Sequence, residues 1–271
     1  MPTIAHTSDL HLQSGVPTRQ TQVEPIFQKI NEMKPDLVVI SGDVTDDGWD
    51  SIEELKWAKG WLEERIEGDW FAVPGNHDVG NFVDLPDGKV TDKRAENWID
   101  LFGSQHEASF DRWIIIGLNS MLIGSELSAR EAENTWLMWG EKRFMTKHVA
   151  SFLHSPLWIN KIDEPHNADA NYWLGSEQGR LATWTQLDYC NNKLICSGHV
   201  HQTRLTEIDG VKIAWAPPAS GTWVHAPGLP NPPMPKQTGF FLHTLHDDGR
   251  VESELIECAP MLKLYEHRPE R

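Results

Sequence analysis

The chain has 271 residues, with 40 acidic and 24 basic side chains and a formal net charge of −16. Such a surface repels polyphosphate backbones and anionic lipids, so we expect no stable nucleic-acid partner and no membrane partner. The sequence has no apolar run of the about 18 residues that a membrane span needs, and residues 1–20 lack the pattern of a signal peptide. Cys190, Cys196 and Cys258 show no CxxC spacing, which predicts reduced thiols in a cytoplasmic protein.

Short apolar runs alternate with amphipathic segments along the chain, as is typical of a layered α/β fold. The apolar runs predict strands at 3–6, 37–41, 71–73, 112–118, 149–153 and 193–197. The amphipathic segments predict helices at 23–33, 51–66 and 178–188. The pattern then becomes hairpin-like, with strands expected at 203–208, 211–215, 239–245 and 251–257. Residues 217–236 hold seven of the 17 prolines, which predicts a surface loop whose role the sequence leaves open.

Potential metal ligands follow five of the predicted strands. They are Asp9 and His11, Asp43, Asn76, His154, and His199 and His201. Because the carboxyl ends of strands form the ligand crevice of an open α/β sheet, we expect these side chains to meet. Two carboxylates, four imidazoles and one amide suit a pair of divalent ions such as Mn, Fe or Zn. A single DxH, GD or HxH would say little, but all five in this order favour a metal site.

The order DxH, GDxxD, GNHD, H and GHxH resembles the calcineurin-like metallophosphoesterase superfamily, and is most similar in look to its bacterial cyclic-nucleotide and glycerophosphodiester phosphodiesterases. The resemblance implies an α/β fold, a four-layer α/β/β/α sandwich of two mixed β-sheets flanked by helices. It also implies one domain over residues 1–271. Within it, 1–201 would bear the ligands, 202–257 would add β segments to the second sheet, and 258–271 would form a tail.

The resemblance further implies a specific role for each site residue. One ion would be held by Asp9, His11, Asp43 and His201, and the second by Asp43 as a bridge together with Asn76, His154 and His199. The expected activity is hydrolysis of a phosphoester by attack of a metal-bridging hydroxide. His77 would protonate the leaving oxygen, and Asp46 would orient His77.

Departures from the family's motifs narrow the range of expected substrates. Asp47 stands where protein Ser/Thr phosphatases carry an arginine after GDxxD, which removes a phosphate clamp and favours small diesters, of the 3′,5′-cyclic nucleotide or glycerophosphodiester type. Trp158, Trp223 and His225 are candidate substrate contacts, with ordinary loop packing as the alternative. Three alternative functions stay open: a phosphomonoesterase, a nuclease and a non-catalytic metal-binding scaffold. The oligomeric state is open as well, with a homo-oligomer as one alternative.

Overall fold

The computed structural model describes residues 1–82, 88–160, 170–220 and 237–260. Their strands form two mixed sheets, ordered β11-β10-β1-β2-β3 and β4-β5-β6-β7-β9-β8. The first sheet comprises β1 (Thr3–Thr7), β2 (Leu37–Ser41), β3 (Trp70–Val73), β10 (Gln237–Leu245) and β11 (Val251–Pro260). The second comprises β4 (His106–Ser109), β5 (Trp113–Gly117), β6 (His148–Phe152), β7 (Asn192–Ser197), β8 (Arg204–Ile208) and β9 (Val211–Trp215).

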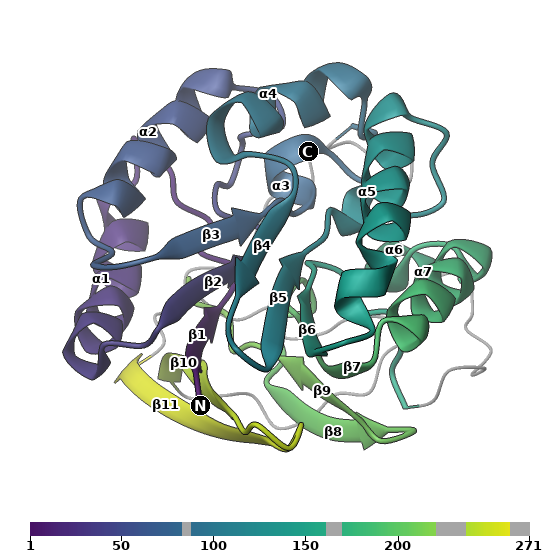
Figure 1. Ribbon diagram of the computed structural model, residues 1–271. Helices are drawn as coiled ribbons and strands as arrows, with labels where there is room; N and C mark the ends of the chain where they lie inside the picture. The colour runs from purple at the N-terminus through teal and green to yellow at the C-terminus, as the bar shows by residue number, and fades with distance from the viewer. Residues whose placement is uncertain (83–87, 161–169, 221–236, 261–271) are drawn as a thin grey trace.

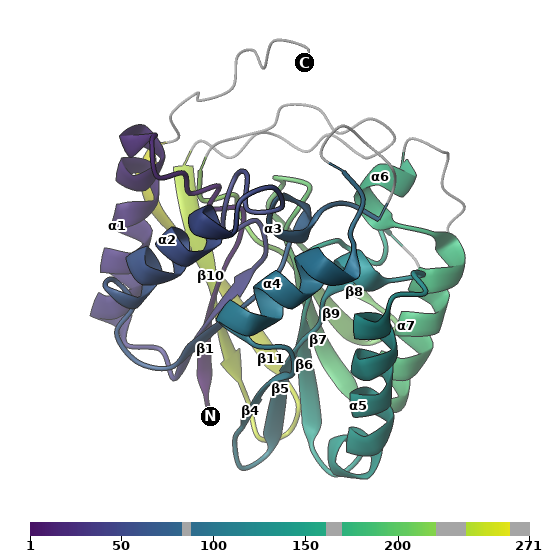
Figure 2. The same cartoon turned by 90° about the horizontal axis from the view of Figure 1, so that it is seen from above.

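Helices cover the outer face of each sheet (Figure 1). The first sheet carries α1 (Pro17–Met33), α2 (Ile52–Glu63) and α4 (Asp92–Phe102), with the short α3 (Asn76–Val79) between β3 and α4. The second sheet carries α5 (Ser128–Phe144), α6 (Ala170–Leu174) and α7 (Glu177–Tyr189), and a 3₁₀ turn spans Ser120–Leu122. Seen from above, the two sheets lie between these two groups of helices (Figure 2). The predicted four-layer α/β/β/α sandwich is confirmed.

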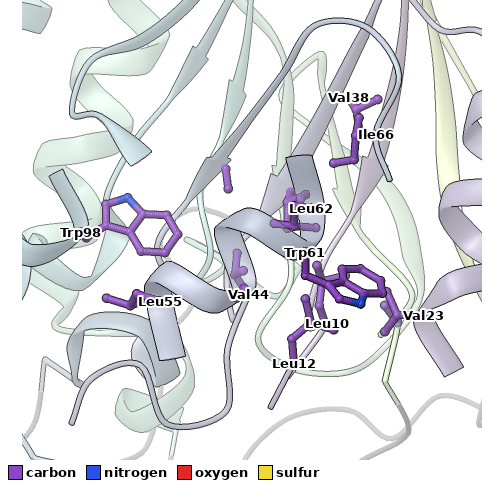
Figure 3. Close-up of a cluster of buried hydrophobic side chains, with 14 of the residues drawn as sticks. Leu10, Leu12, Val23, Val38, Val44, Leu55, Trp61, Leu62, Ile66 and Trp98 are labelled. Carbon is purple, nitrogen blue, oxygen red and sulfur yellow. The ribbon is translucent and has the colours of Figure 1, made fainter. Parts of the chain in front are cut away.

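Three apolar layers hold the sandwich together. Between the sheets, Val39 and Phe71 of the first pack with Ile115, Phe152 and Leu194 of the second. Figure 3 shows the layer under α2, where the side chains of the helix and the first sheet meet. Its labelled members are Leu10, Leu12, Val23, Val38, Val44, Leu55, Trp61, Leu62, Ile66 and Trp98. Burial of each such side chain contributes about 1.5–3 kcal/mol, which fixes the strand ends in place.

The helix boundaries follow from local signals. Ser51 caps α2 because its side chain accepts a hydrogen bond from the backbone N–H of Glu54. The first helix begins at Pro17, six residues before the predicted start at Val23. Proline is favoured in the first helical turn, where its missing N–H costs nothing, and the helix continues through Pro25. Among the described residues, no helix has the length and apolar character needed to cross a membrane.

Candidate metal centre

The ends of parallel strands bring the ligands together. Beyond β1 and β2 the backbone stays paired, with Asp9 N donating to Gly42 O at 3.0 Å and His11 N to Asp43 O at 2.9 Å. In the second sheet, Gly198 N likewise donates to the carbonyl of His154 at 2.9 Å, beyond the parallel strands β6 and β7. Each sheet therefore presents its own candidate ligands at its carboxyl edge.

The backbone is strained at several of the candidate ligands. Among the described residues, eight that are not glycine have a positive φ, and five of the eight are predicted ligands: Asp9, His11, Asp43, His199 and His201. A side chain in this region costs of order 1–3 kcal/mol and persists only where the surrounding fold imposes it. The apolar layers supply that constraint, and the strained turns aim the side chains at one another.

Four candidate ligands form the first set, and their donor atoms all lie within 4.8 Å of one another. His11 Nε2 lies 3.1 Å from His201 Nε2 and 3.6 Å from Asp43 Oδ2. His201 Nε2 lies 3.1 Å from Asp9 Oδ1. These four residues are the predicted ligands of the first ion, and the structure brings all of them together.

Asp43 also belongs to a second set, with His154 and His199. His154 Nε2 lies 3.3 Å from Asp43 Oδ2 and 3.2 Å from Asn76 Oδ1. The two sets therefore share one carboxylate, which is the arrangement expected of a bridging ligand.

The residues fit a pair of divalent ions. Metal–ligand distances of about 2.0–2.2 Å place neighbouring donors of one ion about 3.0–3.6 Å apart. The contacting pairs of the first set match this spacing, at 3.1 Å for His11 and His201 and 3.6 Å for His11 and Asp43. The amide nitrogen of Asn76 is buried without a hydrogen-bond partner among the described residues. Its oxygen is the atom that faces His154. Such close-set donors are what borderline divalent ions bind.

Protonation states suit ligation at three of these residues but not at His154. Burial lowers the pKa of His11 to about 4, and burial together with His154 lowers the pKa of His199 to about 3. Burial opposes ionisation of Asp9, but His201 and His154 together outweigh it and lower the pKa of Asp9 to about 2. Burial also disfavours charge on His154, yet Asp43 raises the pKa of His154 to about 9. An ion that binds His154 must therefore displace a proton.

Asp46 contacts a ligand as well as His77. Its Oδ1 lies 3.1 Å from His11 Nδ1 and 2.7 Å from the guanidinium of Arg19, but 3.9 Å from His77 Nδ1. His77 Nδ1 instead lies 2.7 Å from the main-chain carbonyl of Asp46. The expected orientation of His77 by Asp46 thus takes a different form, because the backbone of Asp46 contacts His77 while its carboxylate orients His11. The rings of His11 and His77 are 4.7 Å apart.

Supporting residues outside the ligand set were not identified from the sequence. Arg19 of α1 donates to the His11 carbonyl at 2.9 Å, in addition to its ion pair with Asp46. The main-chain carbonyl of Tyr172 lies 3.3 Å from His199 Nε2 and that of Ser41 lies 2.8 Å from His154 Nδ1. Such contacts fix the tautomer and orientation of a ligating imidazole. Arg19 and Tyr172 belong to no motif, so no local pattern identifies them.

Asp78, the last residue of GNHD, ties two ligand loops together. It accepts hydrogen bonds from the backbone N–H groups of Val44, Thr45 and Gly75 at 3.1, 2.9 and 2.9 Å. Burial and the charge of Asp43 raise the pKa of Asp78 to about 6. Because Asp78 belongs to the GNHD motif, the sequence could have identified it as a residue of interest. Only the structure shows that its carboxylate holds the two loops together.

The candidate substrate contacts are placed differently. Trp158 is 2% exposed and belongs to the apolar layer between the second sheet and its helices, with the Arg180 guanidinium 5.3 Å from its ring centre. This placement matches ordinary packing, and we give Trp158 no part in the function proposed below. Trp223 and His225 lie outside the described residues. Trp173 of α6, which the sequence analysis did not single out, has its ring 5.2 Å from that of His199.

Comparison with known proteins gives a family and a fold. The family model described as calcineurin-like phosphoesterase matches residues 2–203. A probable glycerophosphodiester phosphodiesterase, GpdQ, from Arcobacter nitrofigilis is 31% identical over 218 residues, which are 75% of this chain and 73% of that protein.

Solved structures share the fold at low identity. GAP50, the anchor in the inner membrane complex of Plasmodium, superposes with a TM-score of 0.64 at 12% identity, covering 97% of this chain and 89% of that one. A dimetal phosphatase from Danio rerio gives a TM-score of 0.61 at 13% identity, covering 96% of this chain and 100% of that one. At such identities the likeness establishes the sandwich alone.

Proposed function

Because the chain belongs to the calcineurin-like phosphoesterase family, we propose that it is a dinuclear-metal hydrolase of small phosphodiesters, of the 3′,5′-cyclic nucleotide or glycerophosphodiester type. The observation that carries the proposal is the pair of ligand sets that share Asp43. The similarity to a probable glycerophosphodiester phosphodiesterase supports the substrate class.

The residues have distinct parts in this reaction. When bound, two ions polarise a phosphoryl oxygen and lower the pKa of water. Asp9, His11, Asp43 and His201 would hold one ion, and Asp43, Asn76, His154 and His199 the other. The Asp46 carbonyl next to His77 Nδ1 can only accept a hydrogen bond, so Nδ1 carries the hydrogen. Nε2 of His77 is then the atom that would give a proton to the leaving oxygen.

Charge around the site supports a diester rather than a monoester. A monoester dianion gains most from fixed cations such as an arginine clamp, but Asp47 occupies the position after GDxxD and accepts a hydrogen bond from Gln13 at 3.0 Å. The nearby Arg19 is paired with Asp46 at 2.7 Å, which offsets its charge. A diester monoanion needs less compensation, so this environment suits it better.

The test compares two chromogenic substrates on protein reconstituted with Mn²⁺. We expect the kcat/KM for bis-(p-nitrophenyl) phosphate to exceed that for p-nitrophenyl phosphate. A ratio below one would contradict the diester proposal and favour a phosphomonoesterase. The kcat/KM values for cyclic AMP and a glycerophosphodiester, measured with the same metal ion, then decide which of the two diester types is preferred.

Two further measurements address the remaining alternatives. Cleavage of single-stranded oligonucleotides at physiological salt would favour a nuclease, which the net charge of −16 disfavours. Fewer than about one bound transition metal ion per chain after reconstitution would favour a non-catalytic scaffold. We expect neither result.

A further inference from the structure

A second cluster of metal-binding side chains lies between the two sheets, apart from the ligand sets described above. His6 of β1, His243 of β10 and Cys196 of β7 are all 0% exposed. Each offers one donor atom, and the three atoms lie within 4.8 Å of one another. The proposed hydrolysis uses none of these residues.

The spacing of the donors is that of ligands around one ion. His243 Nε2 lies 3.4 Å from His6 Nδ1 and 3.5 Å from Cys196 Sγ. The imidazole pair is too far apart for an ordinary hydrogen bond of about 2.7–3.2 Å. Donors about 2.0–2.3 Å from a shared ion are about 3.3–3.7 Å apart. The separation of the two imidazole nitrogens therefore suits a shared metal ion better than a direct hydrogen bond, and the sulfur–nitrogen separation of 3.5 Å is compatible with both.

Serine hydroxyls orient both imidazoles from outside. Ser41 Oγ lies 2.8 Å from His6 Nε2, and Ser253 Oγ lies 2.8 Å from His243 Nδ1. Because a serine oxygen accepts hydrogen bonds, each outer nitrogen can carry its ring's hydrogen. The inner nitrogens then direct lone pairs toward each other and toward Cys196. An outer partner of this kind accompanies most metal-ligating histidines.

We propose that His6, His243 and Cys196 form a metal site for one thiophilic ion, zinc(II) or copper(I). A thiolate with two imidazoles is a soft donor set, which both ions favour. The Phe152 ring lies 5.2 Å from that of His6, and the Phe241 ring lies 5.6 Å from that of His243, so apolar surface encloses the site.

Both imidazoles are in the protonation state that ligation needs, whereas the thiol must lose its proton. Burial lowers the pKa of both histidines, that of His243 to about 3, so both rings are neutral and able to ligate. Burial raises the pKa of the Cys196 thiol, so the thiol is protonated before an ion binds, and formation of the metal–sulfur bond releases that proton to solvent. Since His6 and His243 belong to the first sheet and Cys196 to the second, the ion would join the sheets.

Cobalt(II), a spectroscopic probe for zinc sites, tests the assignment on the full chain. Every ligand proposed for the dinuclear centre is a nitrogen or oxygen donor, so a thiolate-to-cobalt charge-transfer band reports a cysteine. We expect wild-type protein to show the band and to bind one ion more than Cys196→Ser, which should lack the band. Cys190→Ser is the matched control, since Cys190 is 3% exposed in a different apolar layer, and it should keep the band.

A parallel arm uses copper(I) with a competing chelator. We expect wild-type protein and Cys190→Ser to retain one copper(I) that Cys196→Ser loses. The wild-type measurement can overturn the proposal even if a variant fails to fold, whereas assignment of the band to Cys196 needs the folded variant. Wild-type protein that shows no charge-transfer band with cobalt(II) and retains no copper(I) would overturn the proposal. A band that persists in Cys196→Ser would assign the metal to another thiol and overturn it equally.

Discussion

Asp46→Asn separates two roles that one carboxylate could play. Asp46 Oδ1 is 3.1 Å from His11 Nδ1 but 3.9 Å from His77 Nδ1, and the carbonyl that holds His77 is part of the backbone. The substitution removes the charge and leaves that carbonyl in place. We therefore expect the variant to weaken the ion held by His11 and to keep His77 oriented.

The expected size follows from the contacts. Loss of a hydrogen-bonded partner behind a ligating histidine typically costs 10–100-fold in metal affinity or activity, about 1.4–2.7 kcal/mol. Asp46 is 5% exposed and also pairs with Arg19 at 2.7 Å, so the lost charge-assisted bond should lower the free energy of unfolding by about 1–3 kcal/mol. Excess Mn²⁺ should restore most of the turnover.

The assay titrates metal-free protein with Mn²⁺ and follows both bound metal and hydrolysis of bis-(p-nitrophenyl) phosphate. Asp47→Asn is the matched control, because the neighbouring carboxylate contacts Gln13 instead of His11. It should leave the Mn²⁺-binding curve unchanged. If Asp46→Asn bound Mn²⁺ normally and lost turnover only on substrates with poor leaving groups, the carboxylate would act through His77 and our reasoning would be refuted.

Three other predictions concern single residues. Asp43→Asn should abolish tight binding of both ions, whereas His11→Ala should weaken binding of mainly one ion. Metal analysis and kinetics test this prediction. Two bound metal ions and near-normal turnover in Asp43→Asn would exclude Asp43 as a bridging ligand. His77→Ala should keep its metals and lose most activity on alkyl leaving groups, so equal losses on nitrophenyl and alkyl diesters would remove His77 as the general acid. Burial lowers the pKa of His106, whose ring stacks on Phe71 at 5.0 Å, to about 4, so the unfolded chain binds more protons between pH 6.5 and 4. Stability should fall by up to about 3 kcal/mol as pH drops through that window, and His106→Phe should flatten this loss in urea unfolding; an unchanged pH profile would refute the assignment.

The sequence predicted the strands that carry the ligands because their apolar character is local. All five residues of β2 are buried, and their side chains read LVVIS. The polar strand β4, with the sequence HEAS, is only partly buried and shows no such pattern. The helices α4 and α5 were not delimited either; the cap of α4, where Thr91 accepts from Arg94 N, is visible only once the helix start is known.

The clustering of the candidate ligands could also be predicted, since strand ends and short motifs determine where these residues lie. The contacts behind the ligands could not. Arg19 reaches Asp46 from a helix with no motif, and the direction of the Asp46 carboxylate depends on side-chain rotation. Likewise, Trp158 is buried in the apolar layer between the second sheet and its helices, with Arg180 of α7 beside its ring, and the local sequence does not contain these long-range contacts.

The central claim is that two ions share Asp43 in a catalytic centre. The most direct measurement titrates metal-free protein with Mn²⁺ while activity and the electron paramagnetic resonance spectrum are recorded together. We predict that diester hydrolysis reaches its maximum only after a second Mn²⁺ ion binds to the candidate dinuclear centre. At the same point in the titration, the spectrum should show the spin-coupled signal of two manganese ions. Full activity with one bound ion and an uncoupled signal would contradict it.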